Sequence, residues 1–379
     1  MAQIRKNNIF KNGLFLTVIF LLLFSWLEQN EHILKLRPLG GVQPTSENIK
    51  FSVKNWNTAK FQEGQEAYIK DHFGLRPFTV RLYNEIFDRL FGEFMANGVV
   101  MGKEGFLFEE NYLLAASGKD FLGRDSIQRL VKSISSVQEA LNKNGTQLLI
   151  CLAPGKGTFF RDKMPSKYKV SNNNATNFSE FVSELYRAKV PLFDVQTWFM
   201  NLKPRTSFPL FPKTGIHWSS YGEYLVADSL INRAAFLTKK SIPTLKLLRI
   251  EQDLHPRDRD DDIELGMNLL RDLPDFKMAY PKFEIIPIDN EKSLPKTLVI
   301  GDSFFYGMYN WGMMEHVFKG GEFWYYNHER LIPGKETTFI DQLNDYRAEI
   351  QKFDLVILML TEANLPRFGF GFMQSFLAN

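Results

Sequence analysis

Short apolar runs alternate with amphipathic segments through most of the chain after residue 100. The runs have the length of single strands and lie at 147–152, 190–195, 297–300, 322–326 and 354–360. Apolar residues recur with helical spacing at 127–141, and helices are also expected at 219–234 and 339–350. Short, uniformly apolar strands separated by helices are typical of a mainly parallel sheet covered on both faces, so the pattern predicts an α/β sandwich.

The amino-terminal 30 residues predict a membrane anchor. Arg5, Lys6 and Lys11 precede the uncharged segment 14–27, and basic residues hold that end of an apolar segment in the cytoplasm. These 14 residues span about 21 Å, less than the ~30 Å hydrocarbon core of a bilayer, and this length also suits a signal peptide. Because residues 28–32 lack a small-x-small cleavage pattern, we expect an uncleaved, single-pass anchor.

The rest of the chain divides by composition. A polar segment with Pro38, Gly40 and Gly41 indicates a linker, and the helical pattern that follows is interrupted by a turn at Gly74 and Pro77. The predicted parts are a membrane anchor (1–30), a stalk or linker (31–59), a helical arm packing on the catalytic domain (60–100) and one large domain (101–379).

Charge and cysteine content exclude several classes of function. The 46 Lys and Arg residues nearly balance 43 Asp and Glu residues, and the net charge of +3 is spread along the chain, so no nucleic-acid partner is expected. The single cysteine, Cys151, lies in an apolar run and cannot form an internal disulfide. With no cysteine cluster and no His pair at a spacing such as HExxH, we expect neither a metal nor a cofactor.

The strand at 297–300 runs into the turn Gly301-Asp302-Ser303, and an apolar helical stretch follows. Reacting groups in parallel sheets gather beyond the carboxyl ends of strands. Ser303 is therefore a candidate nucleophile, with backbone N–H groups of the following helix available for a developing oxyanion. A serine N-cap, with Asp302 bracing the turn, fits the same three residues.

His217 is the candidate general base. Pro212 and Gly215 form a turn that places it just before the helix beginning near Ser219, where Trp218 is expected to shield one side of the imidazole. A neutral imidazole beside a serine hydroxyl activates an otherwise weak nucleophile. A structural histidine at a helix start is the alternative.

Five motifs together resemble the SGNH-hydrolase-like proteins of the alginate O-acetyltransferase (AlgX/AlgJ) type, over roughly residues 60–379. They are the segment 217–222 (HWSSYG), the GDS turn, Ala153-Pro154-Gly155-Lys156, the early segment GKEGFLF at 102–108, and the anchor. The resemblance implies a three-layer α/β/α sandwich in which Ser303 is the nucleophile and His217 its histidine. Such proteins acetylate secreted polysaccharides, with acyl groups supplied with the help of a membrane-bound O-acyltransferase. For this chain the resemblance implies an acyl-serine O-acetyltransferase held at the inner membrane, with its catalytic domain in the periplasm.

One position departs from the family pattern Asp-x-His-Trp, because Gly215 stands two residues before the histidine. A Ser-His dyad, a carboxylate from elsewhere in the chain, or loss of activity would each explain this departure. The candidate carboxylates are Glu362, Asp258, Asp260 and Asp262. Glu362 is the preferred candidate because it follows the strand that ends near Leu360, at the carboxyl edge of the sheet.

Further residues are expected around the oxyanion and the substrate. They are Gly301, Asp302 and Asn327 for the oxyanion side, with Asn364 as another amide donor, and Tyr306, Tyr309, Trp218 and Lys156 for the substrate side. Asn327 and Asn364 are equally suited to turns, and aromatic residues at the spacing of Tyr306 and Tyr309 are common in protein cores.

Two other functions remain open at this point. With water as acceptor, the same machinery is an esterase or deacetylase. If the change at Gly215 abolished catalysis, the chain would be an anchored glycan-binding or assembly protein.

Overall fold

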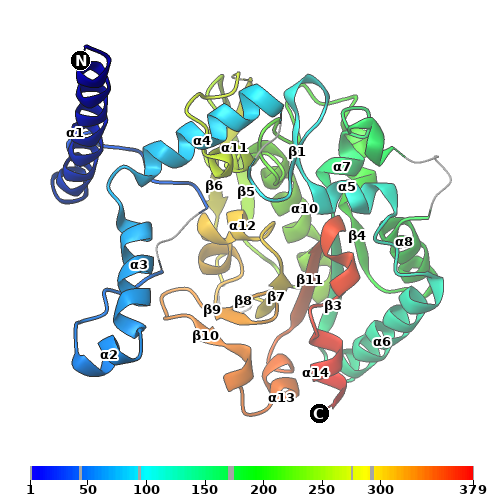
Figure 1. The fold of residues 1–379 in the computed structure, drawn as a ribbon. Coiled ribbons are helices and arrows are strands. Elements are labelled where there is room, and N and C mark those ends of the chain that lie inside the picture. Colours follow the sequence, from blue (N-terminus) through cyan, green and yellow to red (C-terminus); the bar gives the residue numbers. More distant parts are fainter. Residues whose placement is uncertain are drawn as a thin grey trace. The chain divides into compact units, whose positions relative to one another are not determined.

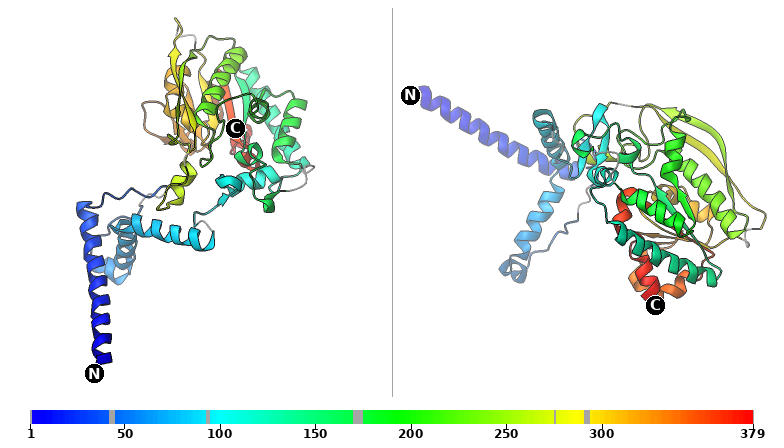
Figure 2. Two further views of the ribbon diagram at one scale, coloured as in Figure 1. Left: turned by 90° about the horizontal axis from the view of Figure 1, so that it is seen from above. Right: turned by 90° about the vertical axis from the view of Figure 1, so that its right-hand side faces the viewer.

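The computed structural model describes residues 2–41, 45–92, 95–169, 175–274, 276–290 and 294–378 (Figures 1 and 2). The chain forms two compact units, one of residues 1–97 and 264–273 and the other of residues 98–263 and 274–379.

The helices are α1 (Ala2–Glu31), α2 (Val53–Asn57), α3 (Lys60–His72), α4 (Arg76–Phe91), α5 (Glu110–Ser117), α6 (Arg124–Lys143), α7 (Lys156–Phe159), α8 (Asn177–Arg187), α9 (Val195–Leu202), α10 (Ser220–Thr238), α11 (Asp262–Met267), α12 (Tyr306–Asn310), α13 (Tyr346–Ile350) and α14 (Phe372–Ala378). Single turns of tighter or wider helix are η1 (Lys103–Gly105), η2 (Ser166–Tyr168), η4 (Met313–Val317), η5 (Ile340–Gln342) and η6 (Glu362–Arg367). The strands are β1 (Val99–Met101), β2 (Leu107–Glu109), β3 (Gln147–Ala153), β4 (Leu192–Asp194), β5 (Thr244–Asp253), β6 (Met278–Ile286), β7 (Thr297–Gly301), β8 (Glu322–Tyr325), β9 (Glu329–Leu331), β10 (Thr338–Phe339) and β11 (Leu355–Thr361).

The amino-terminal helix α1 is longer than the apolar segment seen in the sequence. Its part from Phe10 to Glu31 contains 22 residues, and the most apolar 18-residue stretch of this part has a mean hydropathy of 1.8 and is only 6% buried. At ~1.5 Å per residue this part is about 33 Å long, enough to cross a bilayer core. The helix therefore has the length and composition of a membrane anchor.

Helices α3 and α4 follow the predicted helical pattern and are separated by the turn at Phe73, Gly74 and Leu75. A side chain at position 74 would lie 2.3 Å from the Ser25 carbonyl oxygen, so only glycine allows this close approach. Arg271 forms ion pairs with Glu85, at 2.6 Å, and with Asp88. These contacts hold residues 264–273 to α4, a long-range association that the division of the sequence into consecutive parts did not anticipate.

The second unit is built on a seven-stranded sheet with the order β10-β9-β8-β7-β11-β3-β4. Strands β8, β7, β11, β3 and β4 are parallel to one another, and β9 and β10 are antiparallel additions at one edge. Helices α6, α8, α13 and α14 contribute to the core on one face, where Leu148, Ile150 and Leu152 of β3 are buried. Helix α9 packs on β3 as well, and α10 packs on the hairpin of β5 and β6. The predicted α/β sandwich is confirmed.

Two parts of the fold differ from the sequence prediction. The expected helix at 339–350 is broken: Thr338 and Phe339 pair with β9, and a new short helix begins after Asp345, whose side chain accepts a hydrogen bond from Ala348 N at 2.9 Å. The antiparallel hairpin of β5 and β6 was not foreseen. Its connection, residues 254–277, carries part of the candidate site.

The register of the parallel strands brings four loops to one edge. Thr361 pairs with Ala153, Met359 with Gly301, and Gly301 with Tyr325. The residues that follow β3, β11, β7 and β8 therefore emerge side by side, as expected for parallel strands.

Candidate active site

Ser303 lies in the turn between β7 and α12, and the neighbouring Asp302 holds that turn in place. The Asp302 carboxylate is fully buried, and one oxygen accepts hydrogen bonds from Thr361 N at 2.7 Å and from Asn364 Nδ2 at 2.8 Å. Its other oxygen accepts a hydrogen bond from Phe304 N at 3.1 Å. Asp302 thus fastens the serine turn to the end of the adjacent strand β11, which satisfies the buried charge.

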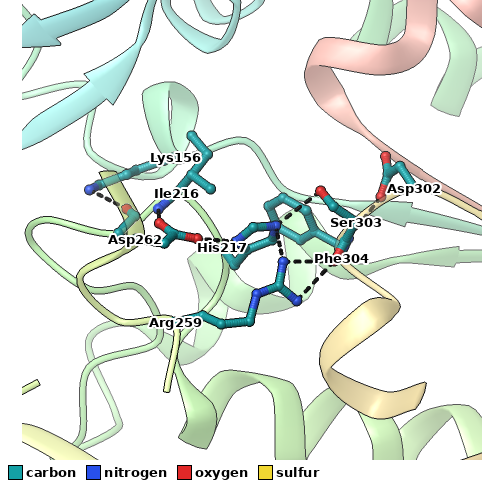
Figure 3. A network of polar contacts seen from close by, with 9 residues as sticks. Lys156, Ile216, His217, Arg259, Asp262, Asp302, Ser303 and Phe304 are labelled. Atoms are coloured by element: carbon teal, nitrogen blue, oxygen red, sulfur yellow. Dashed lines mark hydrogen bonds and ion pairs between the residues drawn. The ribbon is translucent and has the colours of Figure 1, made fainter. Parts of the chain in front are cut away.

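The imidazole of His217 meets the Ser303 hydroxyl. His217 lies just before α10, whose N-cap Ser219 accepts a hydrogen bond from Gly222 N at 3.0 Å. His217 Nε2 is 3.0 Å from Ser303 Oγ, although the two residues are 86 positions apart in the sequence. The two candidates from the sequence therefore lie within hydrogen-bond distance at one edge of the sheet (Figure 3).

Asp262 is the carboxylate that contacts His217. Its Oδ2 is 2.6 Å from His217 Nδ1, and its Oδ1 accepts a hydrogen bond from Ile216 N at 2.8 Å. One carboxylate thus holds both the ring and the backbone of the loop that carries it. With the proton on Nδ1, Nε2 presents its lone pair to Ser303, so the three side chains form the relay of a serine triad (Figure 3).

The space at Gly215 explains why this carboxylate comes from a distant segment. A Cβ atom at position 215 would lie 2.7 Å from the carbonyl oxygens of both Arg259 and Asp260. The connection between β5 and β6 therefore occupies the volume that a side chain at position 215 would need. The same connection supplies Asp262, so the glycine and the relocated carboxylate belong to one arrangement.

The hypothesis that Glu362 orients His217 is wrong. Glu362 does follow β11 at the correct edge of the sheet, but its Oε1 accepts a hydrogen bond from the Thr158 hydroxyl at 2.7 Å and its Oε2 lies against Gly155. Burial raises the pKa of Glu362 to about 7. Its carboxyl group braces the loop after β3, while Asp262 takes the place beside the imidazole.

Arg259, which sequence reasoning missed, approaches the same site. Its guanidinium donates hydrogen bonds to the Ser303 carbonyl oxygen at 3.0 and 3.1 Å, and its Nη2 contacts His217 Nε2 (Figure 3). The Arg259 guanidinium and the Ser303 hydroxyl therefore compete for one acceptor, the lone pair of His217 Nε2. A permanent positive charge at this position also disfavours the imidazolium.

Burial is the main influence on the pKa of His217, because the side chain is almost fully enclosed. Burial lowers the pKa of His217 below its usual 6.5, the Arg259 charge acts in the same direction, and the hydrogen bond with Asp262 opposes both. The imidazole is consequently held neutral near pH 7, which is the state that a general base requires.

Lys156 does not face a substrate. It is completely buried, and its ammonium donates hydrogen bonds to the carbonyl oxygens of Lys213, at 2.8 Å, and Gly215, at 2.6 Å. Burial lowers the pKa of Lys156 to about 7. The residue fixes the backbone of the loop that carries His217.

The residues predicted on the oxyanion side have other roles in the structure. Both oxygens of the Asp302 carboxylate accept hydrogen bonds from N–H groups of the neighbouring turn and of β11 and η6, so this side chain braces the turn. Gly301 lies within the sheet, where its carbonyl accepts a hydrogen bond from Tyr326 N at 2.8 Å. Asn327 donates its amide to the Phe370 carbonyl at 3.2 Å, and the Asn364 amide is bonded to Asp302. These residues therefore have structural roles in place of the oxyanion role that the sequence predicted.

Aromatic residues near the site pack mainly on one another. Tyr306 and Tyr309 both contact the ring of Phe323, at centroid distances of 5.6 Å, which favours the core interpretation for this pair. Trp218 is buried against Phe304 at 5.0 Å, and Phe304, rather than Trp218, faces the His217 ring at 4.9 Å.

Tyr326 is a further residue that the sequence did not single out. It follows β8 at the same edge, beside Ser303 and Asn364. Burial raises the pKa of the Tyr326 hydroxyl, and hydrogen bonding with those two side chains acts in the opposite direction. Its position at the end of a parallel strand was the available signal, but the predicted strand extended through residue 326.

Among the described residues, no cluster of three or more His, Cys, Asp and Glu side chains is arranged to hold a metal ion. The chemistry available at the site is nucleophilic attack by a serine hydroxyl with an imidazole as base.

Comparison with known proteins shows that part of the chain is similar to a known family. Residues 99–250 match the model of a family described as SGNH hydrolase-like domain, acetyltransferase AlgX. A probable alginate O-acetylase AlgJ from Pseudomonas putida is 22% identical over 191 residues, which cover 50% of this chain and 47% of the relative. A probable alginate O-acetylase AlgJ from Pseudomonas syringae pv. tomato is 22% identical over 171 residues, covering 45% and 42%. The chain thus matches somewhat less than half the length of these curated relatives.

The solved O-acetyltransferase domain of Pseudomonas putida AlgJ aligns with 73% of this chain and 99% of that domain, at 15% identity and a TM-score of 0.49. The matched segment is similar to an SGNH hydrolase-like domain, and the mainly parallel sheet agrees with that fold. The resemblance inferred from the motifs is confirmed: part of the chain is similar to AlgX and AlgJ proteins. The matched segment contains His217 and ends before Asp262 and Ser303.

Gly215→Ala is expected to destabilise the fold, because the added methyl group meets backbone atoms that cannot move independently of Asp262. We expect a loss of about 1–3 kcal/mol in the free energy of unfolding, measured by chemical denaturation. Gly266→Ala is the matched control, since a Cβ atom at that position meets nothing within 4 Å. Equal stability of the two variants would contradict the close approach at Gly215.

Proposed function

We propose that this protein is a polysaccharide O-acetyltransferase that works through an acyl-serine intermediate at Ser303. The observation that carries the proposal is the continuous hydrogen-bonded relay from Asp262 through His217 to Ser303. The AlgX/AlgJ-like family supports acetyl transfer to a glycan as the reaction. The relay also argues against loss of activity, because a carboxylate contacts the imidazole despite Gly215.

In the first half-reaction, Ser303 Oγ attacks the carbonyl carbon of an acetyl donor while His217 Nε2 takes the hydroxyl proton. The negative charge that develops on the carbonyl oxygen is stabilised by backbone N–H groups of the turn at Ser303, and the donor's leaving group departs with the proton from His217. Asp262 stabilises the imidazolium that exists between these two transfers.

In the second half-reaction, a glycan hydroxyl attacks the acetyl group on Ser303, and His217 takes its proton. The bond to Ser303 Oγ breaks, and the serine recovers its proton from His217. The products are an O-acetylated glycan and the free enzyme. Water in place of the glycan would give hydrolysis, so the acceptor decides between transferase and esterase.

The proposal includes a location and a partner. The apolar helix α1 anchors the chain in the inner membrane, with the second unit on the periplasmic side, as the basic residues before the apolar segment indicate. A membrane-bound O-acyltransferase supplies the acyl group, and a secreted polysaccharide accepts it.

Ser303→Ala is expected to abolish the acyl adduct and to reduce transfer by at least ~10³-fold, because the nucleophile is removed while the fold is kept. The adduct is measured by mass spectrometry of the intact protein after incubation with p-nitrophenyl acetate. Ser136→Ala, at an exposed position on α6, is the control and should form the adduct normally. Transfer at the wild-type rate in Ser303→Ala would end the proposal.

Asp262→Asn is expected to lower the acylation rate by about 10³- to 10⁴-fold, because the amide no longer holds the Nδ1 proton or stabilises the imidazolium. Glu362→Gln tests the alternative carboxylate with the same chemical change. It should keep a rate close to that of the wild type, since Glu362 bonds to Thr158. Stopped-flow release of p-nitrophenol measures both variants, and the reverse order of rates would refute the assignment of Asp262.

The pH dependence of acylation follows from the pKa of His217. Only the neutral imidazole acts as a base, so the rate should rise with pH and reach half its maximum below pH 6.5, because burial lowers the pKa of this group. Arg259→Gln removes a positive charge that also lowers this pKa. The midpoint should then move to higher pH. A shift to lower pH, measured from the burst rate between about pH 4 and 8, would contradict the role given to Arg259.

A further inference from the structure

A cavity of about 510 Å³ lies beside the catalytic relay, within the second unit. Its lining comes from the start of α10, the connection between β5 and β6, strand β6 and helix α12. His217 and Arg259 both belong to the lining, so the cavity adjoins the imidazole and the guanidinium that contacts its Nε2. The volume falls in the usual range for a small-ligand site.

Three aromatic side chains form an apolar surface in this cavity. The Phe283 ring lies 5.4 Å from Tyr224 and 5.3 Å from Trp311, measured between ring centroids, and all three rings are partly exposed. The rings are inclined to one another, by 36° for Tyr224 and Phe283 and by 79° for Phe283 and Trp311. A single aromatic face in such a cluster suits the C–H face of a pyranose ring, whose burial against it removes apolar area from water. The hydroxyls of the sugar remain free to pair with polar groups at the edges.

Carboxyl groups supply those polar partners. Glu223, Asp258 and Asp260 line the cavity, and Glu223 Oε1 accepts a hydrogen bond from Trp311 Nε1 at 3.1 Å. Burial raises the pKa of Glu223 to about 7 and that of Asp260 to about 8. Carboxyl groups that are partly protonated near neutral pH both donate and accept hydrogen bonds, as sugar hydroxyls require.

The two cationic side chains of the lining, Arg259 and Lys282, already have hydrogen-bond or ion-pair partners. Arg259 is bonded to His217 and to the Ser303 carbonyl oxygen, and the Lys282 ammonium lies 3.8 Å from a carboxylate oxygen of Glu251. A sugar carboxylate in this cavity would therefore meet three carboxyl groups. Arg259 and Lys282 would not neutralise it, because both already have partners. Such a contact is unfavourable, because a desolvated carboxylate needs a partner of opposite charge.

We propose that this cavity is the acceptor subsite and that it takes an uncharged pyranose unit rather than a uronate. The inference rests on the proposed function, because the sugar in the cavity is the group that receives the acetyl. Its hydroxyl oxygen bonds to the acyl carbon, the bond from that carbon to Ser303 Oγ breaks, and the hydroxyl proton passes through His217 Nε2 to Ser303 Oγ. Arg259 moves away from Nε2 when the hydroxyl binds there, since both groups donate to one lone pair.

The test uses the full chain in detergent, with p-nitrophenyl acetate as donor and either cellohexaose, mannohexaose or an oligomannuronate of the same length as acceptor. Mass spectrometry measures acetylated saccharide, free acetate and acetyl-Ser303. Transfer to a neutral saccharide should exceed transfer to the uronate by at least about tenfold. Preference for the uronate, or an acetylated Ser303 that passes its acetyl group to neither neutral saccharide, would overturn this inference but not the proposed function. A wild-type protein that never acetylates Ser303 would overturn the proposed function with it.

Phe283→Ala tests the aromatic surface itself. We expect the KM for the neutral acceptor to rise about tenfold and the ratio of transfer to hydrolysis to fall, because the sugar loses its stacking partner. Phe283→Tyr keeps the ring and should restore both values, which separates a binding role from a folding defect. Phe236→Ala is the matched control, since Phe236 lies on α10 outside the cavity lining and is 82% exposed. An unchanged KM in Phe283→Ala would rule out the subsite.

Discussion

The hydrogen bond between Asp262 and His217 is the interaction on which the candidate site depends. It joins segments 45 residues apart and sets the imidazole tautomer, since a proton held on Nδ1 leaves the Nε2 lone pair directed at Ser303. The second oxygen of the same carboxylate accepts Ile216 N and so fixes the loop as well as the ring. Without this contact, neither the orientation nor the tautomer of the His217 ring would be fixed.

Other buried charges at this edge keep the reacting groups in position. Asp302 accepts three hydrogen bonds and ties the turn of Ser303 to the end of β11. Lys156 donates to two carbonyl oxygens of the loop before His217. A buried charge is tolerated only when its hydrogen bonds are satisfied, so these side chains act as rigid braces. The nucleophile and its base are thereby placed before any substrate arrives, and no reorganisation is needed at the moment of reaction.

Local pattern was enough to select Ser303 and His217, because each stands next to a recognisable element: the end of an apolar strand or the start of a helix. The same reasoning selected Glu362, which does lie at the carboxyl edge of the sheet, and it was wrong about the partner of that carboxyl group. Position along a strand indicates the edge at which a residue emerges, but not the direction of its side chain. Lys156 shows the same limit, since it follows β3 as expected and points into the protein.

Apolar periodicity was enough to predict the parallel sheet, the order of its strands and helices along the chain, and the edge at which the reacting residues lie. Strand burial and helix amphipathicity can be recognised in short stretches of residues. The departure at Gly215 was visible in the same way. The replacement for the missing carboxylate, the place of Arg259 and the cavity beside His217 depend on how residues 258–262 fold against the site. These residues lie in the connection of the unforeseen hairpin of β5 and β6. Hydrogen-bond partners distant in sequence are selected by geometry that arises only when the segments pack together.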